Sequence, residues 1–145
     1  MRAEQKGFSL IELMIALAIV GILSSIAYSA YTGQTQSARQ SAVQGELMDL
    51  ALALESYRSQ NFSYANADVN LAVLSPDLAA STDYNVNIVV DPDGDGDNLD
   101  YRIDVQPLAG GNMVGTGMMS LGSDGTSCLN ETSDNACDPA VNDNW

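Results

Sequence analysis

The side chains best suited to chemistry in this sequence are aspartates between two stretches of alternating apolar and polar residues. Carboxylates recur at every second position from Asp91 to Asp97, separated in part by Gly94 and Gly96, and Asp100 follows. Glycines let a chain curl, so several carboxylates can converge on one point. Ca²⁺ takes roughly six to eight oxygen ligands on a flexible loop, and D-x-D-x-D-G supplies the first three. The candidate calcium ligands are Asp91, Asp93, Asp95, Asp97 and Asp100.

This acidic loop matches only half of a known calcium motif. An EF-hand loop that began at Asp91 would need Glu at its twelfth position, where the sequence has Arg102. The loop is therefore not an EF-hand, and Asp97, Asp100 or backbone carbonyls would complete a calcium shell. The competing interpretation is a solvated acidic turn, because Asp-Gly is a common hairpin pair. No cofactor is required in either case.

Composition argues against an enzyme and against a nucleic-acid-binding protein. The 145 residues carry a formal net charge of −14 and contain no His. The commonest general base is therefore missing, and no Ser/His/Asp, Cys/His or phosphate-loop arrangement is present. The carboxylates could in principle serve glycoside hydrolysis, but they crowd one flexible loop, which suits a cation better. A strongly acidic surface repels phosphate backbones, so we expect no direct nucleic-acid binding.

An apolar block near the N-terminus indicates a membrane segment. Residues 8–31 are long enough to span a bilayer as a helix, which takes about 20 residues. Arg2 and Lys6 precede the block, so the positive-inside rule places the N-terminus in the cytoplasm and the remainder outside. Glu12 lies inside the block. A carboxylate at that depth needs a partner, unless it snorkels to the headgroups at the cytoplasmic edge.

The segment from Lys6 to Met14, with Gly7, Phe8 and Glu12 at its key positions, resembles the class III signal of type IV pilins and type II secretion pseudopilins. The resemblance continues to Tyr31. It implies that a prepilin peptidase cuts between Gly7 and Phe8, and that the new amine of Phe8 is N-methylated. It also implies partners, namely other pilin subunits and an inner-membrane assembly platform. The expected location is the bacterial inner membrane for the precursor and then a cell-surface pilus.

The resemblance gives Glu12 a partner, the Phe8 amine of a neighbouring subunit. An α-amine has a pKa near 8 and is largely cationic at neutral pH. Two opposite charges that are each costly in an apolar core become tolerable when paired, so the pair would set the register of assembly. One departure is Ser29, where many family members have Pro, and it leaves a kink at that position unsupported.

The rest of the sequence predicts an α+β fold that resembles the pilin fold. A helix continues to about Gln60, and its apolar stripe contains Val43, Leu47, Leu50, Leu54 and Tyr57. Residues 61–83 read as a loop with one short helical turn. Alternation predicts strands over 84–90 and 99–106, and a third is expected over 113–121. We expect a long helix packed on an antiparallel sheet of three to four strands. The predicted parts are a leader (1–7), a transmembrane and assembly helix (8–31) and an exported globular domain (32–145).

Two cysteines, Cys128 and Cys137, lie nine positions apart near the C-terminus. The count alone does not separate free thiols from a disulfide. Export favours a disulfide, because oxidising compartments preserve such bonds. Many pilins are similar in carrying a C-terminal disulfide loop.

Three functions agree with these features. The first is a structural subunit of a type IV pilus, most like a minor pilin, that supports adhesion, twitching motility or DNA uptake. The cysteine pair favours it. The second is a type II secretion pseudopilin, favoured by the acidic loop and by the turn Gly122–Gly125 with a late Trp. The third is a single-pass membrane protein that stays anchored as a binding module.

Overall fold

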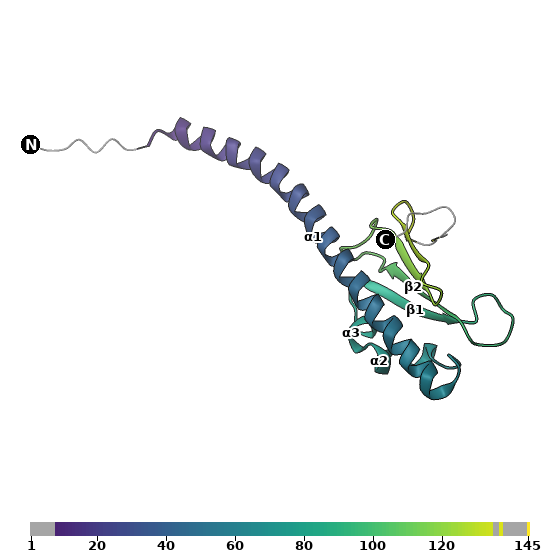
Figure 1. The fold of residues 1–145 in the computed structure, drawn as a ribbon. Helices are drawn as coiled ribbons and strands as arrows, with labels where there is room; N and C mark the ends of the chain where they lie inside the picture. The colour runs from purple at the N-terminus through teal and green to yellow at the C-terminus, as the bar shows by residue number, and fades with distance from the viewer. Residues whose placement is uncertain (1–7, 135–136, 138–144) are drawn as a thin grey trace, which may run out of the picture. The chain divides into compact units, whose positions relative to one another are not determined.

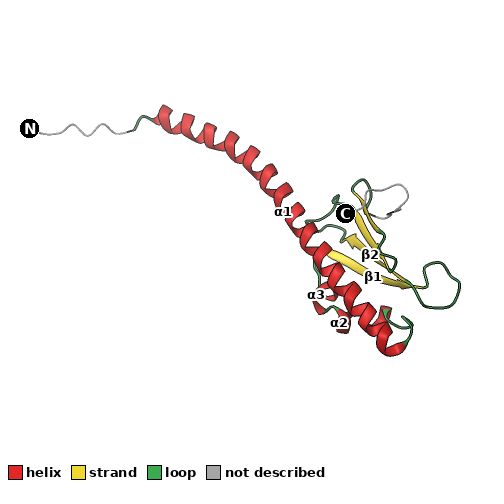
Figure 2. Ribbon diagram, in the orientation of Figure 1, coloured by secondary structure: helices red, strands yellow, loops and turns green. Residues whose placement is uncertain are grey.

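The computed structural model describes residues 8–134, 137 and 145. Its longest element is helix α1 (Leu10–Asn61), and two short α-helices, one 3-10 helix and four strands follow (Figures 1 and 2). The chain divides into two compact units, the first ending at Ser37 and the second beginning at Ala38. Helix α1 runs through this division, so each half of the helix belongs to a different unit.

The first unit is the apolar half of α1. By length and composition this helix could cross a membrane. Its large apolar side chains are exposed all round, as in Leu13, Leu17 and Ile22. The Ser25 and Ser29 hydroxyls donate to the carbonyls of Ile22 and Ile26, which satisfies both hydroxyls within the helix.

The second half of α1 is buried along one face only. Val43, Leu47, Leu50 and Leu54 are each no more than 1% exposed, which confirms four of the five residues predicted for the apolar stripe, and Tyr57 packs against this core while partly exposed. The stripe packs on apolar side chains of the sheet, among them Ile88, Ile103 and Met119. The core of the second unit therefore lies between one helix face and one sheet face.

The segment between α1 and the sheet is more helical than the sequence indicates. It contains a 3-10 helix η1 (Asp68–Asn70), α2 (Leu71–Leu74) and α3 (Pro76–Ala79), where we expected a loop with one helical turn. Pro76 stands at the first position of α3, where its missing N–H costs nothing. Ala67, Leu71 and Leu78 turn toward the core.

The sheet has four antiparallel strands in the order β1-β2-β3-β4. Strands β1 (Tyr84–Val90) and β2 (Tyr101–Pro107) confirm two predicted strands, and their register pairs Val86 with Val105. The remaining strands are β3 (Met118–Gly122) and β4 (Ser127–Asn130). The α+β architecture is thus the predicted one.

The third predicted strand begins five residues too early. Residues 113–117 form a turn, because Gly115 and Gly117 adopt φ values of +83° and +92°. Gly117 also lies directly against the backbone of Asn130 and Glu131, so that an added Cβ would stand 2.8 Å from Glu131 Cα. The sequence offered apolar residues in this stretch but no alternation, so it could not locate the turn or the first residue of β3.

Candidate functional site

The N-terminal site consists of Phe8, Ser9 and Glu12 at the start of α1. Phe8 is 92% exposed and precedes the helix. Gly7, on the other side of the expected cleavage point, lies outside the described residues. Phe8 and Glu12 thus lie at the exposed N-terminal end of an apolar helix.

Glu12 has a local partner that the sequence interpretation missed. Its Oε2 accepts the backbone N–H of Ser9 at 2.9 Å, three residues earlier. This contact is one half of a capping box, in which an acidic residue at the third helical position bonds back to the residue before the helix. The pattern Ser9-x-x-Glu12 was visible in the sequence. The cap uses only one carboxylate oxygen, so Oε1 can still accept a second donor.

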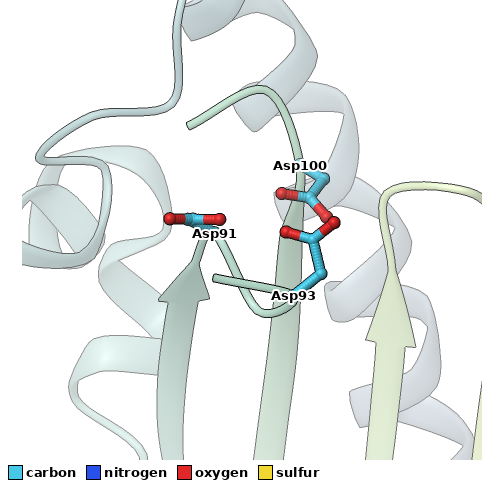
Figure 3. A group of neighbouring side chains, drawn as sticks. All are labelled: Asp91, Asp93 and Asp100. Atoms are coloured by element: carbon cyan, nitrogen blue, oxygen red, sulfur yellow. The ribbon is translucent and has the colours of Figure 1, made fainter. Parts of the chain in front are cut away.

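The acidic loop is anchored at the base of the β1–β2 hairpin. The Asp91 N–H donates to the Asp100 carbonyl at 3.1 Å and closes the loop. Figure 3 shows Asp93 and Asp100 approaching each other across the loop, while Asp91 projects from the end of β1. One carboxylate oxygen from each of these three residues lies within 4.8 Å of the others, and Asp91, Asp95 and Asp97 form a second such group. All five predicted ligands therefore belong to one of two groups that share Asp91.

Much of the loop's shape comes from its own carboxylates. Asp91 accepts the N–H groups of Gly94 (3.1 Å) and Gly96 (3.0 Å). The Oδ1 atoms of Asp93, Asp95 and Asp97 each accept the N–H two residues later. Such Asx turns order a loop without any metal. They also leave the second oxygen of each of these last three carboxylates available to a cation.

Asp100 is the residue whose environment is hardest to explain by a turn alone. Its Oδ1 is buried and has no hydrogen-bond partner among the described residues. Partial desolvation, followed by the negative charges of Asp93, Asp97, Asp91 and Asp95, raises the pKa of Asp100 above its ordinary value. A buried acceptor without a donor, facing other carboxylates, fits a cation better than it fits a bare turn.

The predicted disulfide between Cys128 and Cys137 is present. It joins β4 to the C-terminal segment, and the Trp145 indole N–H donates to the Cys128 carbonyl at 3.1 Å. Asp134 lies within the disulfide loop and accepts the N–H groups of Gly115 (2.8 Å) and Gly117 (2.9 Å). Cys137 and Trp145 are thus tied to β4, and Asp134 is tied to the turn before β3.

Basic side chains are few in the described part of the chain. They are Arg39, Arg58 and Arg102. Arg39 bonds Asp83 at 2.8 Å, and Arg102 bonds both oxygens of Asp104 at 2.9 and 3.0 Å. The Arg58 guanidinium lies 5.4 Å from the centre of the Tyr64 ring. The described surface therefore offers no cluster of cations.

Comparison with known families covers both units of the chain. Residues 2–28 match the family described as the prokaryotic N-terminal methylation motif. Residues 29–117, more than half of the chain, match the family described as "Type IV minor pilin ComP, DNA uptake sequence receptor". No solved structure matches the chain significantly.

Curated relatives include proteins of secretion systems and of pili. The chain is 29% identical to the type II secretion system core protein G of Pseudomonas aeruginosa over 132 residues, which cover 86% of this chain and 87% of that protein. It is 54% identical to the type IV major alpha-pilin of Moraxella bovis over 43 residues, 30% of this chain and 27% of that pilin. It is 43% identical to the type IV major fimbrial protein FimA of Dichelobacter nodosus over 56 residues, 39% of this chain and 36% of that protein.

The two matched families meet within α1 and together account for the apolar helix and most of the α+β domain behind it. The chain therefore belongs to the type IV pilin family, within the group described by its minor pilin ComP.

Proposed function

We propose that this protein is a structural subunit of a type IV pilus, made as a membrane-anchored precursor and cut between Gly7 and Phe8. The observation that carries the proposal is the family match over residues 29–117, joined to a methylation motif at the N-terminus. The exposed apolar half of α1 supports it, because such a surface must be covered by lipid before assembly and by other helices afterwards.

Assembly would use Glu12 and the Phe8 amine of a neighbouring subunit. Glu12 bonds its own helix end through Oε2, which leaves Oε1 for the incoming amine. A subunit in the wrong axial position would leave both charges unpaired in an apolar core, which is costly. The role is structural rather than catalytic, in line with the absence of His and of any nucleophile–base arrangement in the sequence.

A secretion pseudopilin is the main alternative. The Pseudomonas aeruginosa core protein G favours it, because that match covers most of both chains. The pilus is favoured by the minor-pilin match over the globular domain and by the Cys128–Cys137 loop. A single-pass anchored binding protein, the third possibility, would keep residues 1–7 in the mature chain.

The matched family is described as a DNA uptake sequence receptor, but the charge of this chain argues against direct DNA contact. Only three basic side chains follow Gly7, and two of them bond aspartates. DNA affinity rests largely on cationic side chains that neutralise phosphates. A contribution to DNA uptake would then come through the filament and not through a DNA site on this subunit.

We also propose that the acidic loop holds Ca²⁺ when calcium is present. The support is the buried, unpartnered Oδ1 of Asp100 and the convergence of Asp91, Asp93 and Asp100 (Figure 3). A bound cation would offset both the partial desolvation and the carboxylate repulsion that raise the pKa of Asp100, and it would stiffen the β1–β2 hairpin.

The filament role can be tested by shearing surface filaments from cells and identifying their subunits by mass spectrometry. We expect peptides of this chain in the sheared fraction, and we expect them to disappear when pilus assembly genes are deleted. Disappearance only after deletion of secretion genes would indicate the pseudopilin. Retention of the whole protein in the membrane fraction would indicate the anchored module.

A further inference from the structure

The turn over residues 113–117 is held by a side chain from much later in the sequence. The Gly115 and Gly117 N–H groups donate to Oδ2 and Oδ1 of Asp134 at 2.8 and 2.9 Å. Both glycines have positive φ, and the N–H groups of such turns can form a concave site for an anion. Here the anion is a carboxylate of the same chain, so the order of the turn depends on where Asp134 lies.

The disulfide restricts where Asp134 can lie. Asp134 is three positions before Cys137, and the bond from Cys137 to Cys128 ties this segment to β4. The carbonyl of the preceding residue, Ser133, accepts the Met118 N–H at 3.0 Å, so two consecutive residues contact the turn and the start of β3. Opening the disulfide would lengthen the free segment that carries Asp134, and a longer free segment costs more conformational entropy to order.

The same turn also contacts helix α1. The carbonyl of Thr116, which lies between the two glycines, accepts an N–H of the Gln40 side chain at 3.2 Å. The Thr116 hydroxyl donates to the Met113 carbonyl at 2.7 Å and closes the turn on itself. Gln40 is half-buried and lies three residues before Val43, the first residue of the buried stripe of α1. The turn therefore links the disulfide segment to the start of the packed half of α1.

We propose that Asp134 couples the redox state of the two cysteines to the contact between this turn and α1, and we call its two hydrogen bonds the Asp134 latch. With the disulfide formed, the latch is closed and Gln40 has a fixed acceptor. With the cysteines reduced, the latch opens, the two glycine N–H groups bond water, and the Thr116 carbonyl is no longer held toward Gln40. The coupling goes beyond the filament role and does not depend on it.

The coupling must be reciprocal. By linkage, the factor by which the disulfide favours the closed latch is also the factor by which the latch favours the disulfide. Reduction by dithiothreitol transfers two electrons and two protons to the Cys128 and Cys137 sulfur atoms, breaks the bond between them and leaves dithiothreitol as its cyclic disulfide. In the reverse direction a protein disulfide donor accepts the electrons. A newly made chain would therefore complete the contact between the turn and α1 only after such an oxidation.

Hydrogen exchange of the isotope-labelled full chain in detergent micelles, followed by NMR, tests the latch. We expect reduction to accelerate exchange of the Gly115 and Gly117 amides at least about fivefold, which is the lower end of typical coupling between sites. The resonances of the Gln40 side-chain amide should shift at the same time. The Gly125 amide, which donates to the Gly122 carbonyl in the turn between β3 and β4, should keep its exchange rate.

Substitution of Asp134 separates the latch from the disulfide itself. With the disulfide intact, Asp134→Ala should accelerate exchange of the Gly115 and Gly117 amides as much as reduction does in the parent. Reduction of this variant should then add less than about twofold, because the coupled contact is already lost. Asp134→Asn keeps one acceptor oxygen and should give an intermediate rate. The redox equilibrium against dithiothreitol should move toward the thiols in Asp134→Ala by the same factor as the exchange rates.

The matched control is Asp124→Ala, which removes a carboxylate that also accepts two donors, the Thr126 N–H and hydroxyl, in a turn outside the disulfide loop. Its redox equilibrium should stay within about twofold of the parent value. Equal shifts for Asp124→Ala and Asp134→Ala would make Asp134 a general stabilising contact and overturn the proposal. So would unchanged exchange of the two glycine amides in oxidised Asp134→Ala. If reduction unfolds the whole domain, exchange accelerates at Gly125 as well, and the measurements on the oxidised variants decide.

Discussion

Glu12 bonds its own helix through one carboxylate oxygen and keeps the other for the proposed contact with a neighbouring subunit. Oε2 accepts the Ser9 N–H, and the cap orders the first turn of the helix next to the new N-terminus. An ordered first turn would matter for assembly, because the Phe8 amine lies only one residue before the Ser9–Glu12 hydrogen bond. The cap and the proposed intersubunit pair therefore support each other and do not compete.

Substitution of Glu12 separates these two roles. Glu12→Gln keeps an oxygen for the Ser9 N–H but loses the charge, so cleavage and N-methylation should continue while the sheared filament falls at least tenfold. Glu12→Ala removes the cap as well and should be no better. The amount of mature chain in sheared and cell fractions is measured by quantitative mass spectrometry. Parent-level filaments from Glu12→Gln would contradict the charge pairing.

Asp100 gives the sharpest residue-level test of calcium binding. Without metal the pKa of Asp100 is raised above 3.8. At pH values between 3.8 and this raised pKa, the folded chain holds a proton that the unfolded chain has lost. Its share of the stability is present at low pH and disappears as pH rises from about 3.8 through the raised pKa. Saturating Ca²⁺ favours the charged carboxylate and should move the pKa of Asp100 downward.

The measurement is an NMR titration of the Asp100 carboxyl carbon, together with thermal unfolding with Ca²⁺ or with a chelator. The parent should gain a higher unfolding midpoint with Ca²⁺, and the double variant Asp93→Ala, Asp95→Ala should lose that gain. Asp77→Ala is a suitable control, because Asp77 is exposed outside the loop. An unchanged Asp100 pKa and an unchanged midpoint in the parent would refute the calcium site.

At the scale of elements, the sequence predicted the helix and the first two strands because their apolar periods are regular. The four-residue stripe of α1 and the alternation of β2 are both reproduced in the burial. It missed β4, since Ser127–Asn130 is only four residues long, has no alternation of apolar and polar residues, and is held by pairing with β3. The sequence analysis also missed the capping box. The pattern Ser9-x-x-Glu12 is present, but Glu12 was interpreted only as the partner of the Phe8 amine.

Strand β3 begins at Met118 and not at residue 113 because of tertiary contacts, which a local sequence pattern does not reveal. Gly117 can approach Asn130 only without a Cβ, and Asp134, seventeen residues later, accepts its N–H. The acidic loop could be located from its spacing. The burial of Asp100 Oδ1 could not, because it arises from the fold around the loop.

Gly117→Ala should therefore be far more harmful than Gly115→Ala. Both glycines have positive φ, so each alanine costs about 1–2 kcal/mol of backbone strain. At Gly117 the new Cβ also meets the backbone of Asn130 and Glu131, whereas nothing lies within 4 Å at Gly115. The total loss at Gly117 should exceed about 3 kcal/mol. Denaturant unfolding of the full chain in detergent measures both variants, and equal losses would contradict this packing.

At the scale of the whole molecule, the strongly acidic charge leads us to expect no direct binding of duplex DNA. The acidic domain should not bind duplex DNA more tightly than about 100 μM at physiological salt, which is the weak end of non-specific protein–DNA binding. Fluorescence anisotropy with labelled duplexes of mixed sequence measures this. Micromolar binding by the parent would contradict our interpretation, and its persistence with Arg39, Arg58 and Arg102 replaced by Gln would show a recognition mode independent of cationic side chains.

We expect the chain to be cut before Phe8 and to polymerise through the helix that begins there. Intact-mass analysis of the chain from sheared filaments tests it most directly. The expected result is the mass of residues 8–145 with one added methyl group and with Cys128 and Cys137 oxidised. A chain that still begins at Met1, or one that starts after the apolar block, would contradict it.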